Sequence, residues 1–254
     1  MKILTDIISS LEKGIGIKEI CRGPLWTGVV SRRCGLASAL HEGDCSTAAG
    51  KGMLDPGAFL NMTADDMAEL SFSEKIPEAS LGLAAINSLI KLNEDDFEEV
   101  NASEFILKAG KGKNVSIIGH FPFVDEIREE ARNLWVIEKR PREGDCTEDE
   151  GNKLLPESDV IAISSTTLIN HTLSSILELC PPSSVKILLG PTTPMTEIFF
   201  DHGIDIISGS YVTDIPLVLE SIGMGIGFSA MKKRGGIRLL SLVKDREMYK
   251  KIMG

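Results

Sequence analysis

Five short apolar runs recur between residues 113 and 210, and each is followed by a polar loop and then a segment of helical pattern. The runs are Val115–Ile118, Leu134–Ile137, Val160–Ile163, Val185–Leu189 and Ile204–Ile207. Short runs of successive apolar residues are typical of strands that are buried on both faces. Their alternation with helices predicts an α/β fold with a parallel sheet between two helical layers. We expect the strand order 3-2-1-4-5 with right-handed crossovers.

Each run ends in a loop of reactive or hydrogen-bonding side chains. The loops are Gly119-His120-Phe121-Pro122, Glu138-Lys139-Arg140-Pro141-Arg142, Ser164-Ser165-Thr166-Thr167, Gly190-Pro191-Thr192-Thr193-Pro194 and Ser208-Gly209-Ser210. In a parallel sheet these loops lie at one edge, the carboxyl ends of the strands, where open α/β folds bind ligands. The pattern therefore predicts the place of a site before it indicates any chemistry.

The first part of the chain has a different pattern. Apolar residues at helical spacing predict a helix within residues 1–13, and glycines divide Ile15–Leu40 into strand, turn and strand. Thr63 is a candidate helix cap, because acidic residues follow it in the first helical turn. The clearest helix spans Pro77–Leu92, where small residues allow close packing.

A polar stretch, Asn93-Glu94-Asp95-Asp96, is the best candidate linker between two parts. We therefore expect a small α+β domain over residues 1–96. The α/β domain would span residues 97–254 and carry most of the site.

Composition narrows the classes of partner. The 254 residues carry a formal net charge of −10, whereas nucleic-acid binding requires a basic stripe, so we expect no nucleic-acid partner. No run approaches the roughly 20 apolar residues of a membrane helix, and the first residues lack the features of a signal peptide. We expect a cytoplasmic protein with no membrane partner; its oligomeric state stays open. Five widely spaced cysteines without a Cys-x-x-Cys pair predict neither a disulfide framework nor a closed zinc site.

Several longer strings resemble one known family. They are Glu78-Ala79-Ser80-Leu81-Gly82-Leu83-Ala84-Ala85-Ile86-Asn87, Ile118-Gly119-His120-Phe121-Pro122, Leu154-Leu155-Pro156-Glu157-Ser158-Asp159, Thr166-Thr167-Leu168-Ile169-Asn170-His171-Thr172 and Leu189-Gly190-Pro191-Thr192-Thr193-Pro194. The chain is similar over nearly its whole length to the family described as "putative heavy-metal chelation". The resemblance implies an enolase N-terminal-like domain, then a Rossmann-like domain, with a site between them. It also implies a role with metal-chelating or pterin-like molecules.

The first loop, at Gly119 and His120, stands where dinucleotide-binding proteins carry a glycine-rich phosphate loop. The pattern Gly-x-Gly-x-x-Gly is absent, so we expect no bound dinucleotide. His120 is the candidate catalytic residue, as a general base, a metal ligand or a donor to an anion. The alternative is a histidine satisfied by a nearby backbone carbonyl.

Glu138 lies 19 residues after Gly119, at the end of the second run. An acid at this place commonly accepts hydrogen bonds from ribose hydroxyls, but a surface salt bridge with Lys139 or Arg140 is an equal alternative. Arg140 and Arg142 could hold a carboxylate or phosphate, or belong to a solvated loop.

The two hydroxyl-rich loops supply the remaining candidates. Thr166 and Thr167 precede an expected helix over Leu168–Leu179, with Asn170 and His171 in its first turn. One hydroxyl is enough to cap that helix, so the others are candidate anion ligands. Gly190, Thr192 and Thr193 repeat the design before a helix that we expect to begin at Pro194 or Met195. A plain tight connection is the alternative for this loop.

Two further groups lie in the first part. His41-Glu42-Gly43-Asp44-Cys45 holds four metal-competent side chains, although a charged turn is the usual explanation for such a cluster. Glu78 and Asn87 point in opposite directions on one helix. Glu78 is expected to face an interdomain cleft, whereas Asn87 buttresses packing or bonds a neighbouring backbone group.

These candidates favour an enzyme that acts by acid–base chemistry, in condensation or hydrolysis, on a small anionic molecule. We expect one cleft lined by His120, Glu138, Thr166, Thr167, Asn170, Thr192 and Thr193. Its lining should be locally electropositive and should bind phosphate or a carboxylate near one of the threonine pairs. The alternative is a non-enzymatic binder of a heavy metal or of a metal–chelator complex. The sequence leaves open whether a metal ion is bound.

Overall fold

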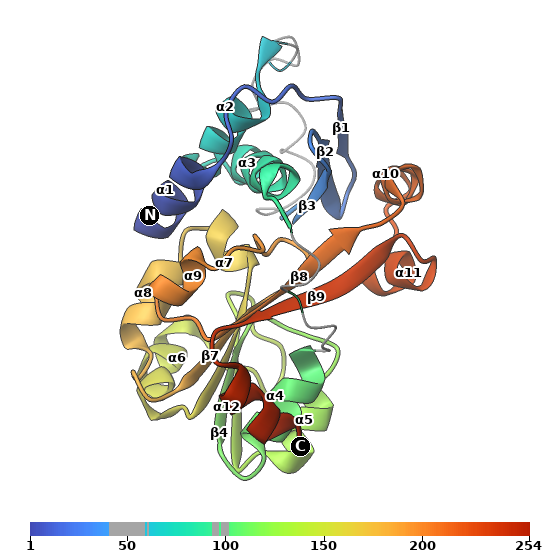
Figure 1. The fold of residues 1–254 in the computed structure, drawn as a ribbon. Helices are drawn as coiled ribbons and strands as arrows, with labels where there is room; N and C mark the ends of the chain where they lie inside the picture. The colour runs from blue at the N-terminus through green and yellow to red at the C-terminus, as the bar shows by residue number, and fades with distance from the viewer. Residues whose placement is uncertain (41–58, 60, 93–96, 98–101) are drawn as a thin grey trace.

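The computed structural model describes residues 1–40, 59, 61–92, 97 and 102–254 (Figure 1). The candidate linker Asn93–Asp96 and the metal-competent cluster His41–Cys45 lie outside the described residues. The fold is mixed α/β, with a small antiparallel sheet of three strands and a mostly parallel sheet of six.

The first part contains helices around the three-stranded sheet, in the order β1-β2-β3. Its elements are α1 (Lys2–Ser10), β1 (Glu19–Arg22), β2 (Trp26–Val30), β3 (Cys34–Ser38), α2 (Ala64–Ala68), a 3₁₀ turn (Glu69–Phe72) and α3 (Ile76–Leu89). The expected strand, turn and strand over Ile15–Leu40 are thus three strands. Thr63 caps α2 through a capping box with Asp66, which confirms the predicted helix start.

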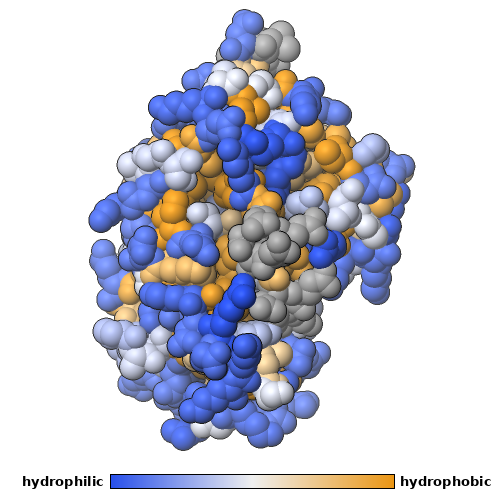
Figure 2. All heavy atoms as spheres, in the orientation of Figure 1, coloured by the Kyte–Doolittle hydropathy of each residue, from blue (hydrophilic) through white to orange (hydrophobic). Residues whose placement is uncertain are grey.

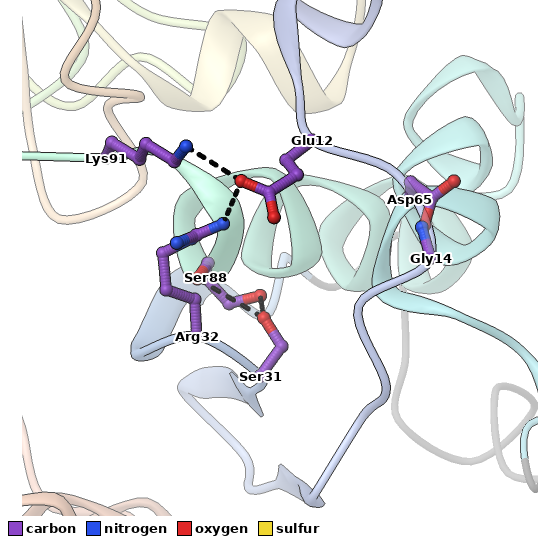
Figure 3. Close-up of polar contacts among 7 residues, drawn as sticks. All are labelled: Glu12, Gly14, Ser31, Arg32, Asp65, Ser88 and Lys91. Carbon is purple, nitrogen blue, oxygen red and sulfur yellow. Dashed lines mark hydrogen bonds and ion pairs between the residues drawn. The ribbon is translucent and has the colours of Figure 1, made fainter.

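Helix α3 is the centre of this part, because almost every one of its side chains is buried. Gly35 in β3 packs directly against it: a Cβ there would overlap the backbone of Ala84 and Ser88. On the surface, Glu12 after α1 accepts from Arg32 and pairs with Lys91 beyond the end of α3 (Figure 3). Backbone contact and surface ion pairs together fix α1, the β2–β3 turn and α3 to one another.

The large sheet has the strand order β5-β4-β6-β7-β8-β9. Its strands are β4 (Asn114–Ile118), β5 (Asn133–Ile137), β6 (Val160–Ser164), β7 (Val185–Leu189), β8 (Ile206–Val212) and β9 (Ile237–Val243). The first four neighbouring pairs are parallel, as predicted. β9 is antiparallel to β8 and was not predicted.

The predicted strand order 3-2-1-4-5 is wrong, because the third strand, β6, pairs with β4 and not with β5. After β5 the chain folds back along the outer edge of this strand. There the Cys146 N–H donates to the Val136 carbonyl, and the Cys146 carbonyl accepts from the Glu138 N–H. That edge is therefore occupied. On the other side of β4, the Ser116 and Ser158 hydroxyls lie 2.7 Å apart and hold the start of β6 beside β4.

The prediction that Ser208-Gly209-Ser210 forms a loop is also wrong, because these residues lie inside β8. Pairing with β9 continues from Ile206 to Val212 and extends the strand beyond the predicted run. The Ser208 and Ser241 hydroxyls meet at 2.6 Å within this pair. The long β8–β9 hairpin carries α10 (Ile215–Gly223) and α11 (Phe228–Lys233) to the side of the small sheet (Figure 1).

Helices cover both faces of the large sheet, and strand residues alternate between them. Val160 and Ala162 face the layer of α4 (Ala102–Gly110), α5 (Val124–Glu130) and α12 (Arg246–Met253). Ile161 and Ile163 belong to a second cluster. This cluster also contains apolar residues of α7 (Thr166–Ile169), α8 (Leu173–Leu179), α9 (Ile198–Asp201), α1 and α3. One hydrophobic cluster thus joins the first part of the chain to the large sheet.

The surface in the view of Figure 2 is more hydrophobic in its upper half, over the first part and its border with the large sheet, than below. The large hydrophobic residues that are exposed among the described residues are Met1, Leu25 and Met224. No described helix combines the length and apolar character that crossing a membrane requires.

The strand order fixes where a site can form. From β4 the chain passes through α5 to β5 on one side, and later connections build the sheet outward on the other side. The direction of winding therefore reverses between β4 and β6. In open α/β sheets the crevice at such a switch point, outside the carboxyl ends of the strands, is where ligands bind.

Candidate active site

A cavity of about 920 Å³ lies at this switch point, at the carboxyl ends of β4, β5 and β6. We call it the switch-point cavity. Its polar lining residues are Gly119, His120, Glu138, Lys139, Arg140, Glu148, Asp149, Asn152, Ser164, Thr166, Thr167, Asn170, Thr172, Ser175 and Glu178. Its apolar lining residues are Leu40, Ile76, Ile118, Ile137, Leu155, Ile176 and Leu179. Leu40 and Ile76 come from the first part of the chain, so both parts contribute to the wall.

Gly119 draws the ends of the three strands together. Its φ of +101° lies in the region that favours glycine, and a Cβ would stand 2.9 Å from Cβ of Ser164 on the neighbouring strand. Gly119 N–H donates to the Ile137 carbonyl at 3.0 Å, which ties the loop after β4 to the end of β5. The loops carrying His120, Glu138 and Ser164 therefore begin side by side.

His120 has an acidic neighbour that sequence reasoning did not assign to it. Its Nδ1 lies 3.7 Å from a carboxylate oxygen of Asp145. The Asp145 side chain is only 3% exposed, and the same oxygen accepts from Arg142 N–H at 2.9 Å. The fixed carboxylate can orient the imidazole. The two residues are 25 positions apart in the chain, and no sequence signal links them.

Glu138 lines the cavity as the first residue of the loop that follows β5. Its N–H donates to the Cys146 carbonyl, which fixes the backbone beneath the side chain. Among the described residues nothing pairs with the Glu138 carboxylate, so the expected alternative of a salt bridge with Lys139 or Arg140 is not found there. Lys139 instead lies 3.9 Å from Glu148 of α6 (Glu148–Leu154).

The expectation of an electropositive lining is wrong. The described lining carries two cationic side chains, Lys139 and Arg140. It carries four carboxylates, those of Glu138, Glu148, Asp149 and Glu178. Three of these acids come from α6 and α8, whose approach to the cavity depends on packing: Gly151 of α6 rests against the side chain of Ile137. Helix-borne residues of this kind cannot be assigned to a loop cluster from sequence.

The loop after β6, Ser164–Thr167, faces the cavity, and we call it the β6 loop. The Ser164 and Thr166 hydroxyls bond to each other at 2.8 Å, and the Thr167 hydroxyl donates to the Ser164 carbonyl. Thr166, Thr167 and Asn170 line the cavity as expected from sequence. The expected helix Leu168–Leu179 is interrupted, because α7 ends at Ile169 and α8 begins at Leu173.

His171 causes this interruption and leaves the cavity. Its φ of +59° is the only positive value among the described residues other than glycine, and no helix continues through it. Its Nε2 donates to the Ser71 carbonyl of the 3₁₀ turn at 2.8 Å. His171, unlike Asn170 beside it, is therefore absent from the described lining of the cavity, and it joins the β6 side of the sheet to the first part of the chain.

The loop after β7, Gly190–Thr193, is likewise directed away from the cavity, and we call it the β7 loop. Thr192 is fully buried and its hydroxyl accepts from Ser38 N–H at 2.9 Å. The Thr193 hydroxyl donates to the Gly190 carbonyl. Asn87 of α3 donates to the carbonyls of Thr192 and Leu36. The expected roles of Gly190, Thr192 and Thr193 as cavity lining are wrong, whereas the expected buttressing role of Asn87 is confirmed.

The next helix does not begin at Pro194 or Met195 as expected. It begins at Ile198, because residues 194–197 continue the connection. Glu78 is also absent from the described lining. Its carboxylate accepts from the Ser73 hydroxyl at 2.7 Å and pairs with Lys75 at 3.2 Å, so it closes the start of α3 locally.

The described residues offer no ready set of metal ligands. Nowhere among them do three His, Cys, Asp or Glu side chains gather in a metal-binding arrangement. Cys21, Cys34, Cys146 and Cys180 are free thiols. Burial raises the pKa of Cys34 to about 12 and that of Cys180 to about 11, so these two thiols stay protonated and unreactive near neutral pH.

Comparison with known proteins supports the fold and identifies the family. The model of the DUF364 family, described as "Putative heavy-metal chelation", matches residues 101–241, and the DUF4213 model, with the same description, matches residues 5–90. An uncharacterised protein of Methanocaldococcus jannaschii is 30% identical over 168 residues. This match covers 63% of the present chain and 64% of that protein, so less than two thirds of its length is spanned.

Two crystal structures of DUF364 proteins of unknown function have the same fold. The protein from Desulfitobacterium hafniense DCB-2 gives a TM-score of 0.80 at 22% identity, covering 96% of this chain and 98% of that one. The protein from Pyrococcus horikoshii gives 0.78 at 20% identity, covering 95% and 98%. The chain belongs to the DUF364 family, whose description is "Putative heavy-metal chelation".

Proposed function

We propose that the protein is an enzyme that binds a small polar metabolite in the switch-point cavity and acts on it by acid–base chemistry, in condensation or hydrolysis. The observation that carries this proposal is the pair of His120 and buried Asp145 at the mouth of three adjoining strands. Histidine is the side chain best suited to exchange protons near neutral pH. A cavity of this size is within the range of small-molecule sites.

In this proposal His120 is the proton carrier and Asp145 its positioning residue. A carboxylate beside Nδ1 favours the tautomer with a proton on Nδ1, which leaves Nε2 free to accept a proton from the substrate. The separation of 3.7 Å is longer than a hydrogen bond, but such contacts often tighten only when substrate is bound. Asp145 then stabilises the imidazolium that forms.

The cavity lining restricts the substrate. An anionic group would face Lys139 and Arg140, the only cationic side chains of the described lining. The carboxylates around the rest of the cavity favour hydroxyl or amine groups on the remainder of the molecule. Ser164 and Thr166 add hydroxyls that can donate or accept. A substrate with several hydroxyl or amine groups therefore suits this lining best, and any single anionic group that it carries would have Lys139 and Arg140 as its partners.

The broader assignments are part of the same proposal. We assign residues 1–96 to an enolase N-terminal-like domain and residues 97–254 to a Rossmann-like domain, with the site residues drawn mainly from the second. The family description supports a place in the metabolism of metal-chelating molecules. Pterin-like molecules also carry the amine and hydroxyl groups that the lining of the cavity favours.

The family description also favours one alternative, a non-enzymatic binder of a heavy metal or a metal–chelator complex. The described residues lack a three-ligand cluster, so such a complex would be held through its organic chelator. The two functions differ in a simple measurement. A binder of this kind should retain stoichiometric metal when purified, as measured by elemental analysis, and should change no metabolite.

The enzyme proposal is tested by incubating the protein with a small-molecule cell extract and following each compound by mass spectrometry. The parent should deplete at least one compound. His120→Gln should slow this by about 100-fold or more, the usual contribution of a general acid–base group. Asp145→Asn should slow it less, and Glu129→Gln, remote on α5, should have no effect. Equal depletion by the parent and His120→Gln would contradict the proposal.

A further inference from the structure

We infer that the metabolite held in the switch-point cavity carries a ribose ring, and that Glu138 binds its vicinal hydroxyls. The inference deepens the proposed function and rests on the same cavity, but it does not depend on the chemistry of His120. It commits to a chemical class of ligand, a ribonucleoside or a close relative without a 5′-phosphate.

The first argument is the position of Glu138 in the sheet. β4 is the first strand of the large sheet along the chain and borders the switch point, and β5 is its outer neighbour at the edge of the sheet. Glu138 is the residue that directly follows β5, and it lies on the cavity. In nucleotide-binding α/β folds an acid at the end of the strand beside the first strand accepts hydrogen bonds from ribose hydroxyls. The corrected strand order keeps β5 in this position.

The second argument is the local geometry. Gly119 N–H donates to the Ile137 carbonyl, so the turn after β4 begins one residue from Glu138. Gly119 has no side chain to stand between that turn and a ligand. The Glu138 backbone is held by Cys146, while no partner for its carboxylate is found within the described parts of the chain. Two carboxylate oxygens without a protein partner can accept from two adjacent hydroxyls.

The third argument distinguishes a nucleoside from a nucleotide. Lining side chains such as Ile118, Ile137 and Leu155 supply apolar surface for a flat ring. A phosphate would add negative charge beside four carboxylates and only two cationic groups. The second glycine of a dinucleotide-binding turn is also missing, because Phe121 stands at that position. The cavity therefore suits a ribonucleoside better than its phosphate ester.

The test measures binding of adenosine, guanosine, cytidine and uridine by isothermal titration calorimetry, each beside its 2′-deoxy counterpart and its 5′-monophosphate. At least one ribonucleoside should bind at millimolar concentration or below. Its 2′-deoxy counterpart should bind about tenfold more weakly, the effect of one lost hydrogen bond to a charged group. The 5′-monophosphate should also bind more weakly than the nucleoside.

Two variants assign the effect to a residue. Glu138→Gln should weaken ribonucleoside binding by about tenfold and remove most of the preference over the deoxy compound. Glu148→Gln removes another carboxylate of the same lining and should keep that preference. If Glu138→Gln does not fold, as judged by its thermal unfolding, the comparison of ribose and deoxyribose in the parent decides alone.

The inference is overturned if none of the four ribonucleosides binds, or if the deoxy compounds bind equally well. It is also overturned if Glu138→Gln retains the parent's preference. The extract experiment separates these failures from a failure of the proposed enzyme. Depletion of a compound without ribose in a His120-dependent manner would leave the enzyme proposal standing alone. Glu138-dependent ribonucleoside binding without any His120-dependent depletion would leave only the ligand class standing.

Discussion

Two loops of similar composition follow neighbouring strands of the large sheet, and the structure uses them differently. The β6 loop, Ser164–Thr167, and the β7 loop, Gly190–Thr193, both combine hydroxyl side chains with a tight turn at the carboxyl edge. The β6 loop lines the switch-point cavity. The β7 loop is buried against the first part of the chain, where Ser38 and Asn87 bond to Thr192.

The two loops differ in the hydrogen-bond partners of their threonine hydroxyls and not in their own composition. A threonine hydroxyl has one donor and two acceptor sites, and burial requires that these find partners. At Thr192 the hydroxyl accepts from the N–H of Ser38 in β3 and donates to the Ser38 hydroxyl, 154 positions along the chain, while Asn87 of α3 donates to the Thr192 carbonyl. At Thr166 the partner is Ser164, two residues away, which leaves bonding capacity free. The same residue type thus has two roles. After β7, Thr192 bonds to Ser38 and Asn87, and we call these buried contacts the clamp. After β6, Thr166 lines the cavity.

Removing the clamp should have the largest effect on stability. Asn87→Ala deletes both hydrogen bonds of the amide and leaves the carbonyls of Leu36 and Thr192 buried without a donor. We expect a loss of about 3 kcal/mol in the free energy of unfolding, measured by urea denaturation. Asn170→Ala is the matched control at the β6 side, where Thr172 is the only partner of the side chain among the described residues. It should lose less than about 1 kcal/mol. Equal losses would mean that the two loops are not different in kind.

How far the sequence predicts this architecture depends on the distance over which each contact acts. The apolar runs and all but the last of their loops were predicted, because strand burial and turn chemistry are local properties. Parallel pairing followed from the alternation with helices. The strand order was not predicted correctly, because residues near Cys146 return to the edge of β5 and exclude a third strand there.

The candidate site was predictable to the same extent. His120, Glu138, Thr166, Thr167 and Asn170 lie around one cavity because each follows a parallel strand of the same sheet or the turn after it. The fate of Thr192 was not predictable, since it depends on a contact with α3. The acidic character of the lining was also hidden, since Glu148, Asp149 and Glu178 lie on helices whose packing brings them to the cavity.

A subtler substitution sharpens the comparison between the two loops. Thr192→Val keeps the shape of the side chain but removes the acceptor for Ser38 N–H. We expect a loss of about 1–2 kcal/mol in the free energy of unfolding, because a partly buried donor stays unpaired. Thr166→Val, the matched change in the β6 loop, should alter stability by less than about 0.5 kcal/mol. A larger loss at Thr166 than at Thr192 would reverse the assignment of the two loops.

The same pair of variants should behave in the opposite way toward ligands. If a ribonucleoside binds in the switch-point cavity, Thr166→Val should weaken its binding by about fivefold, as expected for the loss of one neutral hydrogen bond. Thr192→Val should leave the affinity unchanged at temperatures where the variant is folded. Calorimetric titration of both variants beside the parent measures this directly. An effect at Thr192 without one at Thr166 would show that ligand affinity depends on the clamp.

The smallest expected effect concerns a polar contact on the surface of the first part, in contrast to the buried clamp at its border. Glu12 pairs with Lys91 and Arg32 (Figure 3), and the hydrogen bond from Lys91, followed by that from Arg32, lowers the pKa of the Glu12 carboxyl below its ordinary value of 4.5. A carboxyl whose pKa is lower in the folded state stabilises the fold above the unfolded-state pKa. This contribution is lost as the pH falls through the folded-state pKa.

Glu12→Gln should therefore lower the urea midpoint slightly at pH 7, and the difference from the parent should shrink as the pH falls below 4.5, the ordinary value of the glutamate pKa. Added salt should shrink it too, because exposed ion pairs are screened. Glu129→Gln on α5 is the control, because no ion pair of Glu129 is found within the described part of the chain; it should show little dependence on pH. A difference for Glu12→Gln that grows toward low pH would contradict the lowered pKa. A difference as large as that of Asn87→Ala would mean that surface charge holds the first part together as strongly as the buried clamp does.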